Sequence, residues 1–294
     1  TAARAARVLA SHDPTEASAY GRSAIRAFDW AEGQFARGWN AEARTLRDAR
    51  NLAAVELYKL TGEPRFHEVF LTTTAFNKPR AGLQVWQQFH QREHAWAYLT
   101  TLNRPTDAAV MAHAGAALRA EADQRVELAG QTGFGWTNDP MAWVGWGQQT
   151  TLQNALVLVH AHHLTGEPVY LEALVRAAQF GVGANPLNMV FTTGVGHDFP
   201  RHPLHIDSRV TNQPAPAGIT VYGPDDPVPY GHDQPLYWAT KKLVDNGAIY
   251  PDVRGWPPLE CYWDIFMHPA SAEYTVQETL GPNALVWGYL AGRP

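Results

Sequence analysis

The stretch that decides the fold occurs twice, as LYKLTGEPRF at residues 57–66 and as HHLTGEPVY at residues 162–170. In each copy a glycine, Gly62 or Gly166, supplies the left-handed residue that ends one helix. A proline two positions later starts the next helix with its φ already set. Each copy therefore predicts a helix–turn–helix, and two such hairpins indicate stacked antiparallel helix pairs, as in helical toroids and solenoids.

Helical sequence surrounds both copies through the first two-thirds of the chain. Asp13 and Pro14 form an N-cap and a first-turn proline, and apolar residues then recur at helical spacing as far as Ala31. We expect further helices over residues 45–60, 64–76, 83–102, 107–128, 143–164 and 168–182, with a short one over 236–244 and a last one over 283–291. No alternating strand pattern competes over these spans, so the sequence predicts an all-α fold.

From Gly181 to Ser271 the sequence becomes rich in Gly, Pro, Asp, His and aromatic residues. A loop region of this length inside a compact domain is uncommon unless it is functional. Rigid helices that present elaborate loops are the usual layout of an active face. No linker interrupts the sequence, so we expect residues 1–294 to belong to one domain.

The composition disfavours several classes of function. The net charge is −5 over 294 residues with no block of basic residues, so neither nucleic acid nor a membrane is an expected partner. The sequence contains no run of about 18 apolar residues and no signal-peptide pattern. The single cysteine, Cys261, rules out an internal disulfide. Aromatic residues make up 11% of the chain, which suits either stacking on sugar rings or packing between helices.

The stretch GANPLNMVFTTGVGHDFPRHPLH at residues 183–205 sets His, Asp and Arg side chains beside glycines. It resembles glycoside hydrolase family 9, whose members carry Gly-x-Asn-Pro-x-x-x-Ser-Tyr-Val-Thr-Gly-Phe-Gly and then a proline and a His-His-Arg cluster. Residues 13–30, the turn at 57–66, Trp146-Gly147, residues 222–225 and residues 274–290 follow in the order that the family shows. The resemblance implies an (α/α)6 toroid, of which this chain holds the C-terminal part.

The resemblance also implies a cellulase-like activity, the inverting hydrolysis of a β-linked glucan or a related polysaccharide or oligosaccharide through two acidic residues. Family members read Asn-Glu-Val, a short gap and Asn-Ala before the last helix. This chain reads QETLGPNA at residues 277–284, one residue shorter in the gap and with Gln277 for the asparagine. Glu278 is therefore the candidate general acid and Glu273 the alternative. The competing role for Glu278 is capping of the last helix.

The family's base lies in an N-terminal Asp-Ala-Gly-Asp motif, which these 294 residues do not contain. We expect the base carboxylates in a missing N-terminal segment of the same enzyme, since about eight helices are expected here against the twelve of a closed toroid. This chain alone is then expected to be inactive. The alternatives are a divergent member without the usual base and a non-catalytic glycan-binding toroid.

His202 and His205 match the histidines that line the family's sugar-binding cleft. The family's His-His-Arg becomes His205-Ile206-Asp207 here, with Arg209 two positions late. Asp207 and Arg209 form either a local ion pair or part of a solvated loop. The candidate substrate-binding residues are His202, His205, Asp207, Arg209, Trp146 and Tyr274.

The stretch between Pro227 and His268 is longer than the family leads us to expect. Four aromatic residues in it would favour attack at chain ends if they close one end of the cleft, namely Trp238, Trp256, Tyr262 and Trp263. A polysaccharide substrate implies a secreted or periplasmic protein. The sequence does not determine which polysaccharide is cut or what the oligomeric state is.

The residues His90-Gln91-Arg92-Glu93-His94 match the zinc-peptidase pattern His-x-x-Glu-His. The pattern is short, the chain has 13 histidines, and a third ligand is lacking, so we expect no zinc here. The alternative is a packed helix whose histidines face water. His160, His162 and His163, near a helix C-terminus, are likewise expected to compensate the helix dipole or to be satisfied surface residues rather than ligands. No cofactor is expected, and a structural calcium ion is left open.

Overall fold

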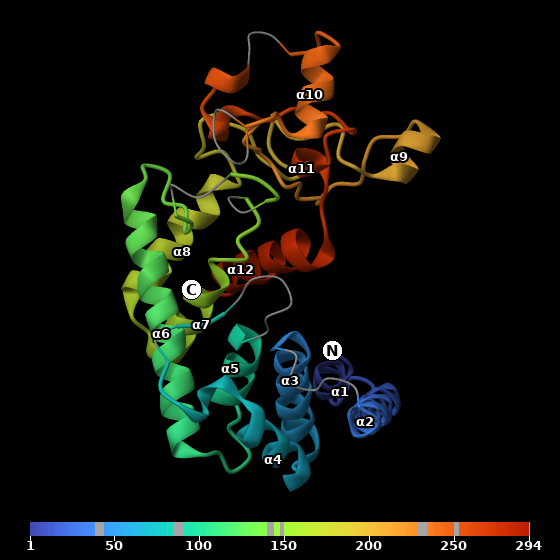
Figure 1. Ribbon diagram of the computed structural model, residues 1–294, viewed down its shortest axis with the longest axis vertical. Coiled ribbons are helices and arrows are strands. Elements are labelled where there is room, and N and C mark those ends of the chain that lie inside the picture. The colour runs from blue at the N-terminus through green and yellow to red at the C-terminus, as the bar shows by residue number, and fades with distance from the viewer. Residues whose placement is uncertain are drawn as a thin grey trace. The chain divides into compact units, whose positions relative to one another are not determined.

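The computed structural model describes residues 1–38, 44–80, 82–84, 91–139, 144–147, 150–228, 234–249 and 253–293. The chain divides into two compact units, Thr1–Glu121 and Ala122–Pro294. Both are helical (Figure 1), and the described residues hold no strand, only isolated bridges between Val182 and Val190 and between Thr192 and Thr220. Among the helices described, none has the length and hydropathy needed to span a membrane.

The first unit is built from helical hairpins. Its elements are α1 (Ala2–Leu9), α2 (Pro14–Ala36), α3 (Arg44–Thr61), α4 (Pro64–Thr73), a 3-10 turn (Ala75–Asn77), α5 (Gln91–Leu99) and the start of α6 (Ala108–Gln131). Helix α2 begins as expected, because the Asp13 carboxylate accepts the Glu16 N–H at 2.9 Å. Gly62, at φ +75°, ends α3 and lets α4 start at Pro64, which confirms the first hairpin.

Aromatic side chains fill the core of the first unit. Phe66, Phe70, Phe76 and Tyr98 are fully buried, and Phe28 meets the Phe66 ring edge-on with centroids 5.2 Å apart. Burying an aromatic side chain of this size stabilises a fold by roughly 1.5–3 kcal/mol. The helical periodicity of the sequence thus places its large apolar residues between the helices.

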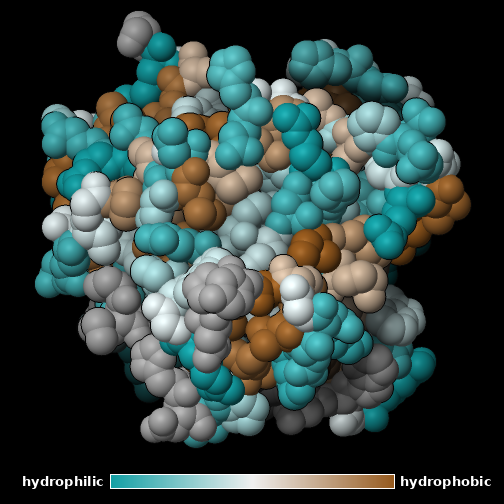
Figure 2. Space-filling view, turned by 90° about the horizontal axis from the view of Figure 1, so that it is seen from above, coloured by the Kyte–Doolittle hydropathy of each residue, from teal (hydrophilic) through white to brown (hydrophobic). Residues whose placement is uncertain are grey.

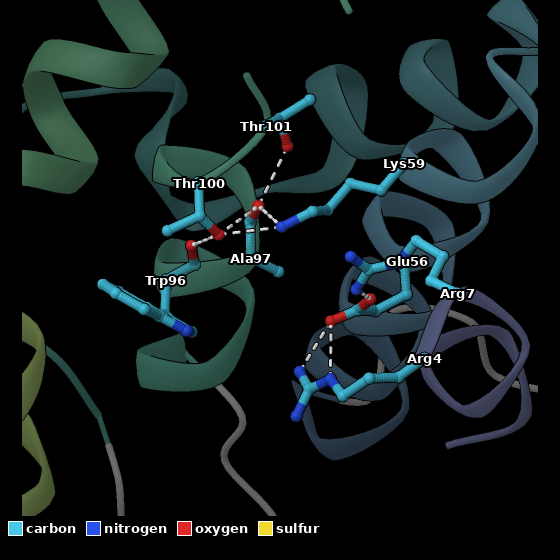
Figure 3. A network of polar contacts seen from close by, with 8 residues as sticks. All are labelled: Arg4, Arg7, Glu56, Lys59, Trp96, Ala97, Thr100 and Thr101. Carbon is cyan, nitrogen blue, oxygen red and sulfur yellow. Dashed lines mark hydrogen bonds and ion pairs between the residues drawn. The ribbon is translucent and has the colours of Figure 1, made fainter. Parts of the chain in front are cut away.

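A polar network links α1 to α3 and α3 to α5 in the first unit (Figure 3). Arg4 and Arg7 both bind the buried Glu56 carboxylate, with Arg4 Nη2 2.6 Å from Oε1. Burial alone would raise the pKa of Glu56, but the two guanidinium groups bring it below its ordinary value. Lys59 Nζ donates to Ala97 O at 3.0 Å. Burial and the charges of Arg7 and Arg4 lower the pKa of Lys59 to about 8.

The described part of the second unit combines several longer helices with a long loop region. Its helices after α6 are α7 (Leu156–Thr165), α8 (Pro168–Phe180), α9 (Ile206–Thr211), α10 (Trp238–Asp245), α11 (Pro269–Ala272) and α12 (Gly281–Ala291). Two 3-10 turns, Val253–Gly255 and Pro258–Glu260, and a π-helical turn, Val276–Leu280, complete it. Gly166, at φ +71°, joins α7 to α8 and confirms the second hairpin.

Backbone hydrogen bonds order the loop region in place of strands. Val221 N donates to Phe191 O at 3.0 Å, and Thr193 N donates to Ile219 O at 2.9 Å. The Asn185 side-chain amide donates to the carbonyls of Phe180 and Met189 at 2.7 and 2.8 Å. The asparagine of the Asn-Pro run therefore fixes the start of the loop on the end of α8.

Two of the expected helices begin later than the sequence suggests. The helix expected from residue 143 begins at Leu156, because Trp146, Gly147 and Leu152 all have positive φ and cannot continue a helix. The helix expected from residue 83 begins at Gln91, and residues 82–84 are not helical. Helix α9 was not expected, because histidine at its N-cap is not a recognised capping signal.

Candidate active site

Glu278 lies in the π-helical turn before α12. The Thr275 hydroxyl caps this turn by accepting the Glu278 N–H at 2.9 Å. The same hydroxyl lies 3.3 Å from Glu278 Oε2, and the Tyr222 hydroxyl donates to that oxygen as well. The Glu278 carboxyl is half-buried and is held by two hydroxyl groups. Glu278 also lies near the start of the last helix.

Tyr222 connects Glu278 to the loop region. It is only 3% exposed, and its N–H donates to Glu273 O at 2.9 Å. Its ring meets that of Trp146 edge-on, with centroids 5.7 Å apart. Burial, followed by the hydrogen bond and charge of Glu278, raises the pKa of Tyr222 above its ordinary value. The hydroxyl therefore keeps its proton and acts as a donor.

Glu273, the alternative acid, directly follows α11. Its side chain is half-buried. Burial, and then the charge of Glu278, raise the pKa of Glu273 above its ordinary value. A raised pKa suits a group that must deliver a proton, so this carboxyl also has a property of an acid catalyst.

The segment from His202 to His205 lies against the stretch that carries the two glutamates. Leu204 N donates to Ala272 O at 2.8 Å. The His205 ring stacks on Tyr274 with centroids 6.4 Å apart and an interplanar angle of 29°. The structure therefore brings His205 and Tyr274 into one loop cluster with Glu273.

Asp264 fixes the backbone around His202. Its two carboxylate oxygens accept the N–H groups of Arg201 and His202 at 2.6 and 2.9 Å. The His202 side chain itself is exposed. An exposed imidazole on a rigid backbone is accessible for contact with a ligand.

Asp207 and Arg209 are both among the described residues, and they form no ion pair with each other. The prediction of a local ion pair is therefore wrong. Both side chains are exposed on α9. The Arg209 guanidinium lies 4.6 Å from the centroid of the Phe266 ring, a cation–π contact. His205 sets this arrangement by capping the helix, since its Nδ1 accepts the Ser208 N–H at 3.2 Å.

Trp146 borders the other side of Tyr222. It is 37% exposed, and its ring also meets Tyr237 edge-on at 6.4 Å. Of the four aromatic residues expected to close one end of the cleft, Trp238 is exposed and the others are half-buried. Trp256 and Trp263 pack against each other with centroids 6.4 Å apart. The closure itself stays a prediction.

A buried acid–imidazole pair lies beside the rings of Tyr237 and Trp263, which contact its imidazole. Asp225 and His268 are both fully buried, with Oδ2 and Nε2 3.9 Å apart. Thr240 Oγ1 lies 2.9 Å from the same imidazole nitrogen, while no described residue hydrogen-bonds the Asp225 carboxyl. Burial and the charge of Asp226 raise the pKa of Asp225 to about 8, and burial lowers the pKa of His268 to about 4. At neutral pH both are therefore uncharged, in spite of their proximity.

Because of this pair, we expect the folded chain to lose stability as the pH rises from 6.5 to 8. The folded chain keeps the Asp225 proton up to a pKa of about 8, whereas the unfolded chain loses it near 4, so stability falls over that range. His268 makes the fold more stable as the pH rises from about 4 to 6.5, which is the opposite effect. Above pH 6.5, therefore, Asp225 is the member of the pair that changes the stability. At about 1.4 kcal/mol per pH unit, the free energy of unfolding falls by roughly 2 kcal/mol.

The measurement compares urea unfolding of the unchanged chain and of Asp225→Asn at pH 6.5 and at pH 8. Asparagine keeps the shape of the side chain without a titrating proton. The loss should be absent from the variant, and the difference between the two proteins removes the contribution of every other titrating group. An equal loss in both proteins would show that Asp225 is already ionised in the folded chain.

The structure describes only part of the zinc-peptidase pattern. His90 lies outside the described residues. His94 is fully buried with its ring edge-on to Phe70 and Phe76, so it does not face water as the alternative supposed. The described residues hold no group of three or more His, Cys, Asp or Glu arranged for a metal. The absence of zinc binding stays a prediction, as does the open question of calcium.

The other three histidines also depart in part from expectation. His160 and His162 are buried, and only His163 is exposed. His162 Nδ1 lies 2.7 Å from the Tyr289 hydroxyl, which ties α7 to α12. The surface alternative is therefore wrong for His160 and His162, and for His162 the contact with α12 accounts for the burial.

A cavity of about 530 Å³ opens on the second unit beside α12. It is lined by Val182, Thr192, Val195, Gly218, Thr220, Leu280, Asn283, Ala284 and Trp287. None of the candidate site residues lines this cavity, so the cavity does not support the roles predicted for them. The face that carries α9 and α10 is largely hydrophilic, with apolar patches between the polar residues (Figure 2).

Sequence reasoning did not assign a role to three residues that the structure places around the candidates. Tyr222 and Thr275 hold the Glu278 carboxyl, and Asp264 holds the backbone of His202. In the sequence Tyr222 stands out only as part of the matching stretch at residues 222–225. Thr275 three residues before Glu278 is a capping spacing that the sequence does display. Asp264 acts at a distance of 62 residues, which no local pattern reveals.

Comparison with solved structures shows the fold. The glycoside hydrolase family 9 endoglucanase J30 superposes with a TM-score of 0.77 at 24% identity, covering 99% of this chain and 53% of that one. A thermostable endoglucanase variant from Alicyclobacillus acidocaldarius gives 0.75 at 22%, with coverage of 99% and 53%. AaCel9A in complex with cellobiose-like isofagomine gives 0.74 at 24%, with coverage of 99% and 53%.

The chain thus spans about half the length of the solved structures that it matches, and its helices are those of the (α/α)6 toroid over that half. No curated protein matches the sequence. The sequence model of glycosyl hydrolase family 9 matches residues 1–281, nearly the whole chain. The chain therefore belongs to glycosyl hydrolase family 9.

Proposed function

We propose that this chain supplies the general acid for inverting hydrolysis of a β-linked glucan or a related polysaccharide or oligosaccharide, and that Glu278 is that acid. The observation that carries the proposal is the Glu278 carboxyl, held by the Tyr222 and Thr275 hydroxyls in a chain of this family. AaCel9A, which shares the fold, was solved with a cellobiose-like ligand, which supports a glucan-like substrate here.

In the proposed reaction, Glu278 gives its proton to the leaving oxygen of the glycosidic bond while a carboxylate on the opposite face of the sugar activates water. The two carboxyl groups of an inverting pair stand roughly 6.5–9.5 Å apart, which leaves room for the water. His202, His205, Asp207 and Arg209 would hydrogen-bond the sugar hydroxyls. Trp146 and Tyr274 would offer their ring faces to the sugar.

Glu273 is the second candidate for the acid. Its raised pKa favours it, whereas the hydroxyl contacts favour Glu278. We assign the role to Glu278 because it also matches the position of the family's acid before Asn283-Ala284. The assignment is tested by substitution, as described in the Discussion.

The base is proposed to lie outside these 294 residues, because the Asp-Ala-Gly-Asp motif does not occur among them. An N-terminal segment of the same enzyme would then be the partner that completes the site, and this chain alone would show no turnover. A polysaccharide-cutting enzyme meets its substrate outside the cytoplasm, so a secreted or periplasmic location goes with this proposal.

The second candidate function is glycan binding without catalysis. The missing base motif favours it, since a binding protein needs aromatic rings and histidines but no acid–base pair. The hydroxyls on the Glu278 carboxyl argue against it, because a pure binder has no need to orient an acid.

The test is the anomeric form of the first product released from a soluble β-glucan by the intact natural protein, followed by proton NMR. Inversion at a β-linkage gives the α-anomer first, and the β-anomer then forms only by mutarotation. Initial release of the β-anomer would contradict the inverting mechanism. Binding of the glucan without any product would support the second candidate.

A further inference from the structure

We propose that Tyr222 is a positioning residue for the acid: its hydroxyl engages Glu278 Oε2 and so leaves Oε1 as the oxygen that carries and delivers the proton. This inference rests on the proposed function of Glu278 and goes beyond it, because it names the oxygen that faces the substrate and the residue that selects it.

The contacts around the carboxyl are one-sided. The Tyr222 hydroxyl donates to Oε2, and the Thr275 hydroxyl lies 3.3 Å from that same oxygen. The Thr275 hydroxyl can make both contacts, because it accepts the Glu278 N–H at 2.9 Å through a lone pair and keeps its own proton to donate. An oxygen that accepts two hydroxyl protons is a poor place for a third, so a protonated Glu278 carries its hydrogen on Oε1.

Tyr222 itself is fixed on all sides. Its N–H donates to Glu273 O at 2.9 Å, and its carbonyl accepts the Thr150 hydroxyl at 2.7 Å. Its ring packs against Trp146 and against the backbone of Gly147, where a Cβ would come within 2.5 Å of the ring. A ring held in this way cannot follow the carboxyl if it turns, so the hydrogen bond fixes the rotation of the Glu278 side chain.

The chemical consequence follows from the proton balance. During cleavage the Oε1–H bond breaks, a new O–H bond forms on the leaving oxygen, and the electron pair of the broken glycosidic bond stays on that oxygen. Glu278 is left as a carboxylate. The Tyr222 hydroxyl then donates to a full negative charge, and hydrogen bonds to charged groups are stronger than those to neutral ones. Tyr222 thus aims the acid before the step and stabilises its product afterwards.

The test is Tyr222→Phe in the intact natural protein, assayed on a soluble β-glucan. Phenylalanine keeps the buried ring and removes only the hydroxyl. We expect kcat to fall roughly 10- to 100-fold with KM little changed, the range that loss of a hydrogen bond to a charged group gives. The alkaline limb of the kcat–pH profile should move to higher pH, because the ionised carboxyl loses a donor.

Tyr170→Phe is the matched control. The Tyr170 hydroxyl also donates to a carboxylate, Asp123 Oδ1 at 2.7 Å, and the ring is also buried, but it belongs to α8 and not to the site. Its kcat and pH profile should stay as in the unchanged protein.

An activated aryl glycoside separates positioning from general damage. The leaving group of this substrate needs little protonation. The Tyr222→Phe variant should therefore hydrolyse the aryl glycoside at nearly the normal rate while it loses activity on the glucan. An equal loss on both substrates with an unmoved alkaline limb, or a loss caused by unfolding, would overturn the proposal. Adding Tyr222→Phe to Glu278→Gln should cost nothing further on the aryl glycoside, and an additional loss would place Tyr222 outside the acid's pathway.

The proposed function has its own separate failure. If Glu278→Gln keeps full activity on the glucan, the acid is elsewhere and both proposals fall. If Glu278→Gln is inactive there while Tyr222→Phe behaves like Tyr170→Phe, only the role of Tyr222 is wrong.

Discussion

Glu278→Gln is expected to abolish hydrolysis of polysaccharide by the intact natural protein while leaving glycan binding nearly unchanged. Glutamine keeps the shape of the side chain, and its amide oxygen can still accept the Tyr222 hydroxyl that contacts Oε2. It cannot deliver a proton to the leaving oxygen, and general acid catalysis contributes about 10²–10⁴ in rate. Binding is proposed to depend on the aromatic rings and on His202 and His205, which the change does not touch.

The assay needs a natural polysaccharide, because an aryl glycoside with a good leaving group would hide the defect. Glu172→Gln, on the exposed side of α8, is the matched control and should keep full activity. Binding is followed by calorimetry with a cello-oligosaccharide. Retained hydrolysis in Glu278→Gln would remove Glu278 from the acid role and move the search to Glu273.

Gly147→Ala is expected to lower the free energy of unfolding by about 2–4 kcal/mol. Gly147 has φ +74°, a conformation that costs an alanine about 1 kcal/mol. An added Cβ would stand 2.3 Å from Thr151 Cγ2 and 2.5 Å from Tyr222 Cδ1. Both side chains are buried, and overpacking of this kind costs a further 1–3 kcal/mol, roughly. The displaced Tyr222 should also reduce hydrolysis.

Gly166→Ala provides the matched control for this prediction. Gly166 has nearly the same φ, +71°, but nothing lies within 4 Å of the position that its Cβ would take. It should therefore lose only the conformational part, about 1 kcal/mol. Urea unfolding measures both variants. Equal losses would show that the space around Gly147 relaxes and that backbone conformation alone matters.

The hairpins and most helices could be predicted from local sequence. Asp13, Gly62 and Gly166 act through hydrogen bonds and dihedral angles within a few residues, so their effect is visible in the sequence alone. The helix expected from residue 143 was wrong because Trp146 and Leu152 have positive φ, which neither residue type indicates.

The candidate site was predictable only in part. The resemblance supplied Glu278, His202, His205 and Tyr274 as a set, and the structure brings His205, Tyr274 and Glu273 together. It could not supply the Arg209 contact with Phe266, because the two residues are far apart in sequence and nothing in either pattern pairs them. The burial of His94 and His162 was missed for the same reason.

The sequence by itself determined the two helical hairpins and the positions of most helices, which loop region carries the polar residues, and to which family the chain is similar. These properties depend on capping residues, glycines and apolar spacing that act over one or two helical turns. Only the tertiary structure decided that Tyr222 and Thr275 share one oxygen of Glu278 and that Asp225 is buried beside His268. Such contacts join residues up to 56 positions apart, and they exist only once packing has closed the loops between them.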